Sequence, residues 1–207
     1  MMRQLATNSM VMNLEKLNDM LLKDRPSEEI LKNEAELFEF IPELKACKGF
    51  EQNNEWHVYD VYGHILHVLD NVPSNLILRM TALFHDIGKP QTYFMDEKGI
   101  GHFYGHWVAS QRIFEEFATK HEMDREETKK ISDLIYYHDI NISVMKPANK
   151  RKVYNLFGSE GIKMLYTFKR ADLLAQNSKF HYLLKDYDEQ EKEFLLRFEG
   201  SESGGRD

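Results

Sequence analysis

The chain has 207 residues, of which 42% are hydrophobic and 29% are charged, proportions that are ordinary for a globular domain. Its formal net charge of −7 argues against a broad surface for nucleic-acid phosphates, because such surfaces are generally basic. The sequence contains neither an apolar run of about 18 residues, which a transmembrane helix requires, nor a second cysteine to pair with Cys47. No secretory signal is evident near Arg3, so we expect a cytoplasmic protein that does not contact a membrane.

Apolar residues at helical spacing predict helices along most of the chain. The first covers residues 10–22, and the second begins with Ser27 as its cap and ends before Pro42. A loop rich in Gln and Asn follows at residues 49–56, and Asp60 is expected to cap the next helix. The later helices are predicted over residues 61–72, 74–85, from 105 onward, 125–138, 147–156, 160–175 and 180–198.

Residues 92–103 have a different character. Aromatic and aliphatic side chains flank the turn sequence Asp96-Glu97-Lys98-Gly99, which predicts a small β-hairpin that turns at Gly99. The fold class is therefore expected to be all-α, a helical bundle with one hairpin. We expect the helices within residues 1–45 to pack on a main domain over residues 46–199, and the polar tail at 200–207 to be disordered.

An adjacent imidazole and carboxylate, His85-Asp86, end an apolar helical run at a point where Gly88 and Pro90 signal a stop. Buried polar groups are costly unless they are paired or bind a metal. A metal site inside a helical domain takes ligands from several helices, because one helix face offers only close neighbours in sequence. The chain offers such a set of imidazoles and carboxylates: His64, His85, Asp86, His106, His138 and Asp172. Mixed ligands of these types suit iron, manganese, nickel, cobalt or zinc better than calcium.

Four stretches carry a family resemblance: Asp60-Val61-Tyr62-Gly63-His64, His85-Asp86-Ile87-Gly88-Lys89-Pro90, Phe103-Tyr104-Gly105-His106 and Lys169-Arg170-Ala171-Asp172. In this order they resemble successive motifs of the HD-domain metal-dependent phosphohydrolase superfamily, over residues 42–177. The HD region of bacterial tRNA nucleotidyltransferases is similar in further positions, namely Ile41-Pro42-Glu43-Leu44, Gln52 and His57. The chain shows no nucleotidyltransferase signature before this region, so we expect a free-standing relative of the hydrolytic module.

The resemblance implies roles for individual residues. One metal would be held by His64, His85, Asp86 and Asp172, and a second by His106 and His138, with Asp86 bridging the two ions. Asp86 and Lys89 would be catalytic, and the Lys89 ammonium would neutralise phosphate charge. The further candidates for contact with substrate are Tyr104, Arg112, Lys146 and Arg170, and the cofactors would be one or two divalent transition-metal ions.

Structural interpretations of the same residues stay open at this stage. His106 could cap the helix that follows the hairpin, and His138 could belong to a buried helix end rich in tyrosine. Lys89 could be a cation favoured by the helix dipole. His57 and His102 are expected to be loop residues that at most border the cleft.

The activity that the resemblance implies is hydrolysis of a nucleotide or another small phosphoester by metal-activated water. A phosphodiesterase, a nucleotidase and a pyrophosphohydrolase all fit this description. The alternative is a non-catalytic HD module that binds tRNA or a regulatory nucleotide. The acidic charge disfavours extended nucleic acid, and the sequence is compatible with a homo-oligomer.

Overall fold

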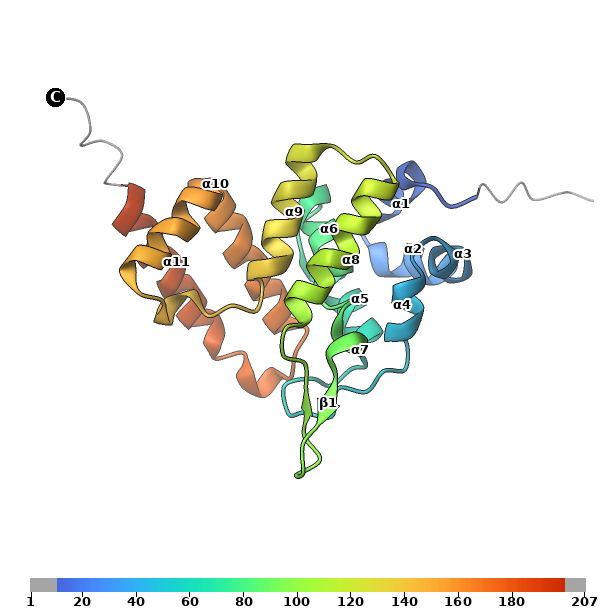
Figure 1. Cartoon of the computed structure of the whole chain (residues 1–207), viewed down its shortest axis with the longest axis horizontal. Helices are drawn as coiled ribbons and strands as arrows, with labels where there is room; N and C mark the ends of the chain where they lie inside the picture. The colour runs from blue at the N-terminus through green and yellow to red at the C-terminus, as the bar shows by residue number, and fades with distance from the viewer. Residues whose placement is uncertain (1–10, 200–207) are drawn as a thin grey trace, which may run out of the picture.

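The computed structural model describes residues 11–199, and this part of the chain is built of helices joined by loops, with one two-stranded antiparallel sheet (Figure 1). The expected all-α fold with a small hairpin is confirmed. The predicted disordered tail at 200–207 lies outside the described residues. Within residues 11–199, no helix combines the length and the apolar character that crossing a membrane requires.

Four short helices open the described chain: α1 (Leu14–Leu21), α2 (Pro26–Lys32), α3 (Glu34–Phe40) and α4 (Pro42–Cys47). The prediction of one helix from Ser27 to Pro42 is wrong, because the chain breaks at Asn33. Pro42 then starts a further helix, since proline lacks the N–H that the first helical position leaves unpaired anyway. Ser27 is not the cap of α2 but lies inside it, and its hydroxyl donates a hydrogen bond of 2.6 Å to Asp70.

The centre of the fold is formed by α5 (Val61–Asn71) and α6 (Leu76–Phe84). Asp60 caps α5 as predicted, and its Oδ1 accepts a 2.6 Å hydrogen bond from the backbone N–H of Gly63. All residues of α6 from 78 to 84 are buried, as expected of a helix that is covered on every side. A turn at His85-Asp86 leads from α6 to the short α7 (Lys89–Thr92).

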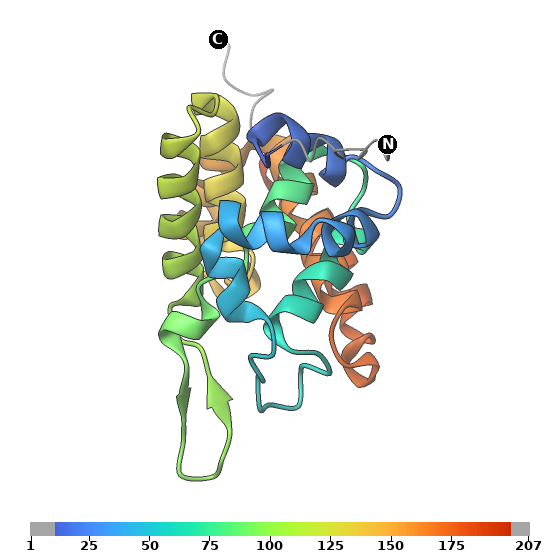
Figure 2. The same ribbon diagram turned by 90° about the vertical axis from the view of Figure 1, so that its right-hand side faces the viewer.

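The hairpin consists of β1 (Phe94–Met95) and β2 (Gly101–His102), with Phe94 opposite His102. Gly99 has a φ of 77° in the turn, a conformation that glycine adopts without strain. Figure 2 shows the hairpin projecting beyond the helices, beside the loop that precedes α5. The two are joined by a 2.9 Å hydrogen bond from the N–H of Gly101 to the carbonyl of Asn53.

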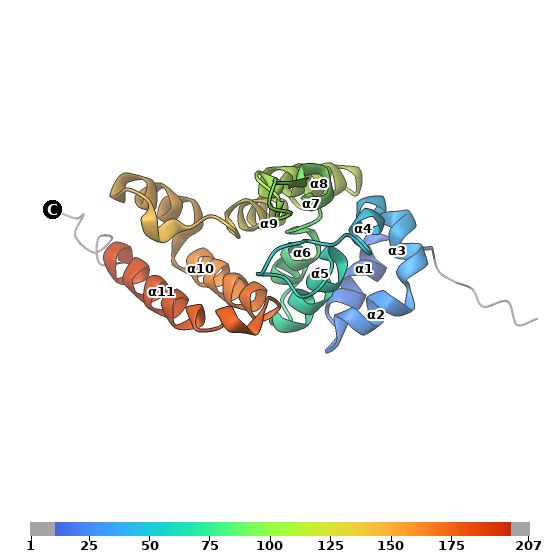
Figure 3. The same cartoon turned by 90° about the horizontal axis from the view of Figure 1, so that it is seen from below.

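The C-terminal half contains α8 (His106–Lys120), α9 (Arg125–Tyr137), α10 (Pro147–Leu174) and α11 (Leu183–Glu199), with 3-10 turns η1 (Ile142–Val144) and η2 (Ser178–Phe180). Gly158 interrupts α10 with non-helical angles (φ 61°, ψ 179°), which agrees with the two helices predicted on either side of it. Figures 1 and 3 show α10 and α11 side by side at one end of the molecule, and the N-terminal helices at the other.

Candidate metal centre

The six predicted ligands converge from five segments of the chain. His64 lies in α5, His106 begins α8, and Asp172 lies near the end of α10. His85, Asp86 and His138 follow the ends of α6 and α9. Their donor atoms form two groups, His64 with His85 and Asp172, and Asp86 with His106 and His138, and within each group all donors lie within 4.8 Å of one another.

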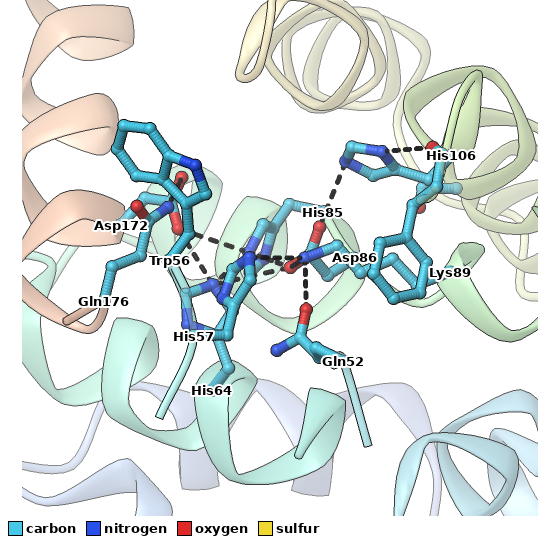
Figure 4. Close-up of polar contacts among 12 residues, drawn as sticks. Gln52, Trp56, His57, His64, His85, Asp86, Lys89, His106, Asp172 and Gln176 are labelled. Atoms are coloured by element: carbon cyan, nitrogen blue, oxygen red, sulfur yellow. Dashed lines mark hydrogen bonds and ion pairs between the residues drawn. The ribbon is translucent and has the colours of Figure 1, made fainter. Parts of the chain in front are cut away.

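The Asp86 carboxylate lies between the imidazoles of the two groups (Figure 4). Its Oδ2 is 3.4 Å from Nε2 of His64 and 3.3 Å from Nε2 of His85. Its Oδ1 is 3.2 Å from Nε2 of His106 and 3.6 Å from Nε2 of His138. Each oxygen of this one carboxylate therefore faces a different group of imidazoles, the arrangement that a bridging ligand requires.

The spacing within each group fits a single ion. With metal–ligand bonds of about 2.0–2.2 Å, two ligands of one ion lie about 3–3.5 Å apart. In the first group Nε2 of His64 is 3.3 Å from Nε2 of His85 and 2.9 Å from Oδ1 of Asp172. In the second, Nε2 of His106 is 3.2 Å from Nε2 of His138.

The hydrogen bonds of the imidazoles define which nitrogen faces inward as an acceptor. Nδ1 of His85 lies 2.8 Å from the carbonyl of Ala82, and Nδ1 of His138 lies 2.6 Å from that of Ile135. His106 repeats this contact, at 2.9 Å from the carbonyl of Phe103, and does not cap its helix. A neutral imidazole that donates through Nδ1 presents a lone pair at Nε2, as metal-binding histidines commonly do.

Lone pairs that face each other repel unless a cation lies between them. Nε2 of His106 lies 3.2 Å from Nε2 of His138, so their lone pairs face each other when both imidazoles are neutral and donate through Nδ1. In the first group, Oδ1 of Asp172 is buried without a hydrogen bond of acceptable geometry. The donor set therefore fits divalent transition-metal ions.

The pKa shifts of three candidate ligands favour metal binding, whereas burial of His138 is outweighed by its hydrogen bond to Asp86, which raises its pKa. Burial raises the pKa of Asp86, but the neighbouring His85 and Lys89 more than offset this and hold it well below its usual range. Asp172 behaves alike, because contact with His64 outweighs burial and lowers its pKa. Burial lowers the pKa of His85, which favours the neutral imidazole. Ionised carboxylates and neutral imidazole are the forms that bind metal.

Lys89 lies beside the bridging carboxylate. Its ammonium donates to Oδ2 of Asp86 at 2.6 Å and to Oε1 of Gln52 at 2.8 Å, and it lies 3.4 Å from Nε2 of His57. Burial, followed by the nearby Lys89 charge, lowers the pKa of His57 well below its usual value. The sequence indicated Gln52 only as part of a resemblance, and it predicted His57 to be a loop residue that at most borders the cleft.

A second buried lysine was not predicted. The Lys169 ammonium donates to the backbone carbonyls of His138 and Ile140, at 2.6 and 2.9 Å, and burial lowers the pKa of Lys169 to about 8. The signal in the sequence was its spacing, because Lys169 precedes Asp172 by three residues and so lies on the same face of α10. Lys169 thereby holds the chain that follows α9, where His138 lies.

A cavity of about 630 Å³ opens onto the two groups, and its size is that of a small-ligand pocket. Asp86, Lys89, Lys169 and Asp172 line it, together with Tyr104, which is 70% exposed. His57 and His102 line it as well, and they therefore contribute to the wall of the cleft.

Three predicted substrate contacts lie elsewhere and do not line this cavity. Arg112 pairs with Glu116 at 2.9 Å on the surface of α8. Lys146 is exposed just before α10. The guanidinium of Arg170 binds Asp188 and Glu191 of α11, at 3.1 and 2.7 Å. Helical spacing places Arg170 on a different face of α10 from Asp172, which explains why the two point apart.

Two comparisons with known proteins cover the part of the chain that carries this site. The family model of the HD domain matches residues 56–176, more than half of the chain, and this segment contains all six candidate ligands. The A-adding tRNA nucleotidyltransferase of Deinococcus radiodurans is 26% identical over 120 residues, which cover 55% of this chain and 27% of that protein. The chain therefore spans about a quarter of the length of this relative.

Proposed function

Because the chain belongs to the HD domain family, we propose that it is a divalent-metal-dependent phosphohydrolase that cleaves a nucleotide or another small phosphoester. The support comes chiefly from Asp86, whose two oxygens face two separate groups of imidazoles. Divalent ions held there would supply Lewis acidity toward phosphoryl oxygens and an activated water.

The chain's own residues prepare the site for an anionic substrate. Lys89 binds Oδ2 of Asp86 and keeps this carboxylate ionised and oriented. Lys169 brings a second ammonium to the cavity wall and fixes the backbone around His138. Both cations are buried, where charge interacts with a bound phosphoryl group more strongly than it does in water.

The intact donor set favours hydrolysis over a purely binding role. A module that only bound RNA would not need six converging metal-ligand side chains. It would also not need three of the imidazoles to be oriented by a hydrogen bond to a backbone carbonyl. The acidic net charge of −7 also opposes binding of a long polyanion.

The test is a substrate panel with added metal. Purified protein is incubated with Mn²⁺, Fe²⁺, Co²⁺, Ni²⁺ or Zn²⁺ and with p-nitrophenyl phosphate, bis(p-nitrophenyl) phosphate or nucleotides. We expect hydrolysis with at least one metal, its loss in Asp86→Asn, and no change in Glu116→Gln, which alters an exposed carboxylate of α8. Absence of turnover with every metal would refute the proposal, and tRNA retardation that weakens with salt would then favour the binding module.

A further inference from the structure

The helix α11 lies beyond the segment that matches the HD family, yet it forms one wall of the cavity. Leu183, Asp186, Tyr187 and Gln190 line the cavity from α11. Their spacing of three, four and seven residues places them on one face of the helix. A wall outside the shared family region is where this chain can differ from other members in what it binds.

The same face of α11 changes character along its length. Farther along, it carries Phe194 and Phe198, which are buried at 4% and 2% exposure. Where it faces the cavity it carries a carboxylate, a phenol and a carboxamide instead. A face that packed only on protein would continue to be apolar, so the polar half is suited to a ligand.

The polar atoms of these side chains have no hydrogen-bond partner within the described part of the protein. The side chains of Asp186, Tyr187 and Gln190 form no hydrogen bond or ion pair with residues 11–199, although the ring of Tyr187 contacts that of Tyr166. Burial raises the pKa of Tyr187 to about 12, so its hydroxyl is a neutral donor. Polar groups of a cavity wall need new hydrogen-bond partners when a ligand displaces water from them. These three side chains are therefore available to bind a ligand.

Arg170 fixes the position of this wall. Its ion pairs with Asp188 and Glu191 hold α11 against α10, next to the turn that carries Asp172. Figures 1 and 3 show the two helices lying together. Helix α10 therefore positions both the candidate ligand Asp172 and the α11 wall.

The charged side chains that line the cavity come from different elements of the fold. Both ammonium groups, Lys89 and Lys169, contact the candidate ligands or their backbone. The α11 wall contributes the carboxylate of Asp186 and no lysine or arginine to the lining, whereas Asp139 directly follows the candidate ligand His138. A phosphoryl group is favoured at the metal side, and additional phosphates near α11 are disfavoured by like charge.

We propose that the face of α11 formed by Asp186, Tyr187 and Gln190 binds the nucleoside part of a substrate that carries a single phosphoryl group. This proposal rests on the proposed phosphohydrolase function and narrows its substrate. The ribose hydroxyls and base edge donate to and accept from the carboxylate, the phenol and the carboxamide. Nucleoside triphosphates are poor substrates, because their further phosphates meet the acidic wall.

The test combines a selectivity ratio with direct binding. For the metal-loaded protein, kcat/KM is measured with nucleoside monophosphates, cyclic nucleoside monophosphates, nucleoside triphosphates and the two p-nitrophenyl esters. In Tyr187→Phe and Gln190→Leu we expect the ratio of nucleotide to p-nitrophenyl ester to fall about tenfold, through KM, as for one lost hydrogen bond. The control is Glu189→Gln, an exposed residue of the same helix outside the cavity lining.

Calorimetric titration with adenosine, guanosine, cytidine and uridine gives a readout that does not depend on turnover. We expect at least one nucleoside to bind the wild type, and Tyr187→Phe to weaken its binding about tenfold. Hydrolysis of p-nitrophenyl esters with no nucleoside binding and an unchanged ratio would overturn the α11 proposal alone. Nucleoside binding that requires Tyr187, without hydrolysis of any ester, would overturn the proposed function and leave the wall supported.

Discussion

Replacing Asp86 by asparagine should weaken metal binding at both groups of donors, whereas replacing Asp172 should weaken it at only one. The difference follows from geometry. Oδ1 of Asp86 faces His106 and His138, and Oδ2 faces His64 and His85. Asp172 belongs to the group with His64 and His85 alone.

The expected magnitude has a lower bound. Loss of a residue that merely supports a metal ligand costs about 10–100-fold in affinity. Loss of a ligand itself should cost at least that much, which is about 1.4–2.8 kcal/mol per ion. Asp86→Asn should lose this binding free energy at each of two ions, which is at least about 3–6 kcal/mol in total. Asp172→Asn should lose half as much, because it affects only one ion.

The assay is calorimetric titration of the metal-free protein with Mn²⁺, together with the metal content after dialysis. Glu116→Gln controls for loss of a carboxylate, and circular dichroism checks that each variant is folded. Asp86→Asn leaves the buried Lys89 ammonium without its carboxylate, so the double variant with Lys89→Met serves if the single one unfolds. One ion bound at wild-type affinity in both Asp86→Asn and the double variant would refute the bridging geometry.

Three further variants test the packing and hydrogen bonding of the fold. Gly88→Ala should lower the free energy of unfolding by about 1–3 kcal/mol, because its added Cβ would lie 2.6 Å from the backbone nitrogen of Ser110. Thermal melting measures this, and an unchanged Tm would show that α8 shifts to accommodate the methyl group without cost. Arg79→Met should cost about 2–4 kcal/mol, since the buried guanidinium donates to four backbone carbonyls; denaturant unfolding with less than about 1 kcal/mol lost would contradict that contribution. Asp96 accepts a hydrogen bond from His102, which lowers its pKa below 3.8. The stabilisation of the hairpin by ionised Asp96 should thus be present above pH 3.8 and be lost as the pH falls through the lowered pKa. Protection factors of the hairpin amides against hydrogen exchange measure this loss. Asp96→Asn should abolish the pH dependence of these protection factors.

The helices and the ligand set were largely accessible from the sequence, for local reasons. Apolar spacing marks helices wherever one face is buried, and Asp60 and Gly99 carry their own signals for a cap and a turn. The break at Asn33 was missed because the apolar spacing continues across it. The division into residues 1–45 and 46–199 stays a prediction.

The candidate substrate contacts were harder to predict from the sequence, because a charged residue does not reveal whether its face of the helix points into the cavity. Arg170 is two residues from Asp172, yet it binds α11 instead of lining the cavity. Lys169 has no assigned role in the motif, yet it is buried beside His138. The face that each residue presents depends on which helices pack on α10, and this is set by contacts that are distant in sequence.

The sequence by itself determined which chemistry the chain carries: imidazoles and carboxylates at the ends of apolar helices, in the order of a known family. Such groups are costly to bury without a metal or a partner, so their residue types and order predict a metal site. Only the tertiary structure decided how they divide into two groups, with one oxygen of Asp86 facing each. It also decided that α11 closes the cavity, because the packing of one helix on another is a long-range choice that local patterns do not encode.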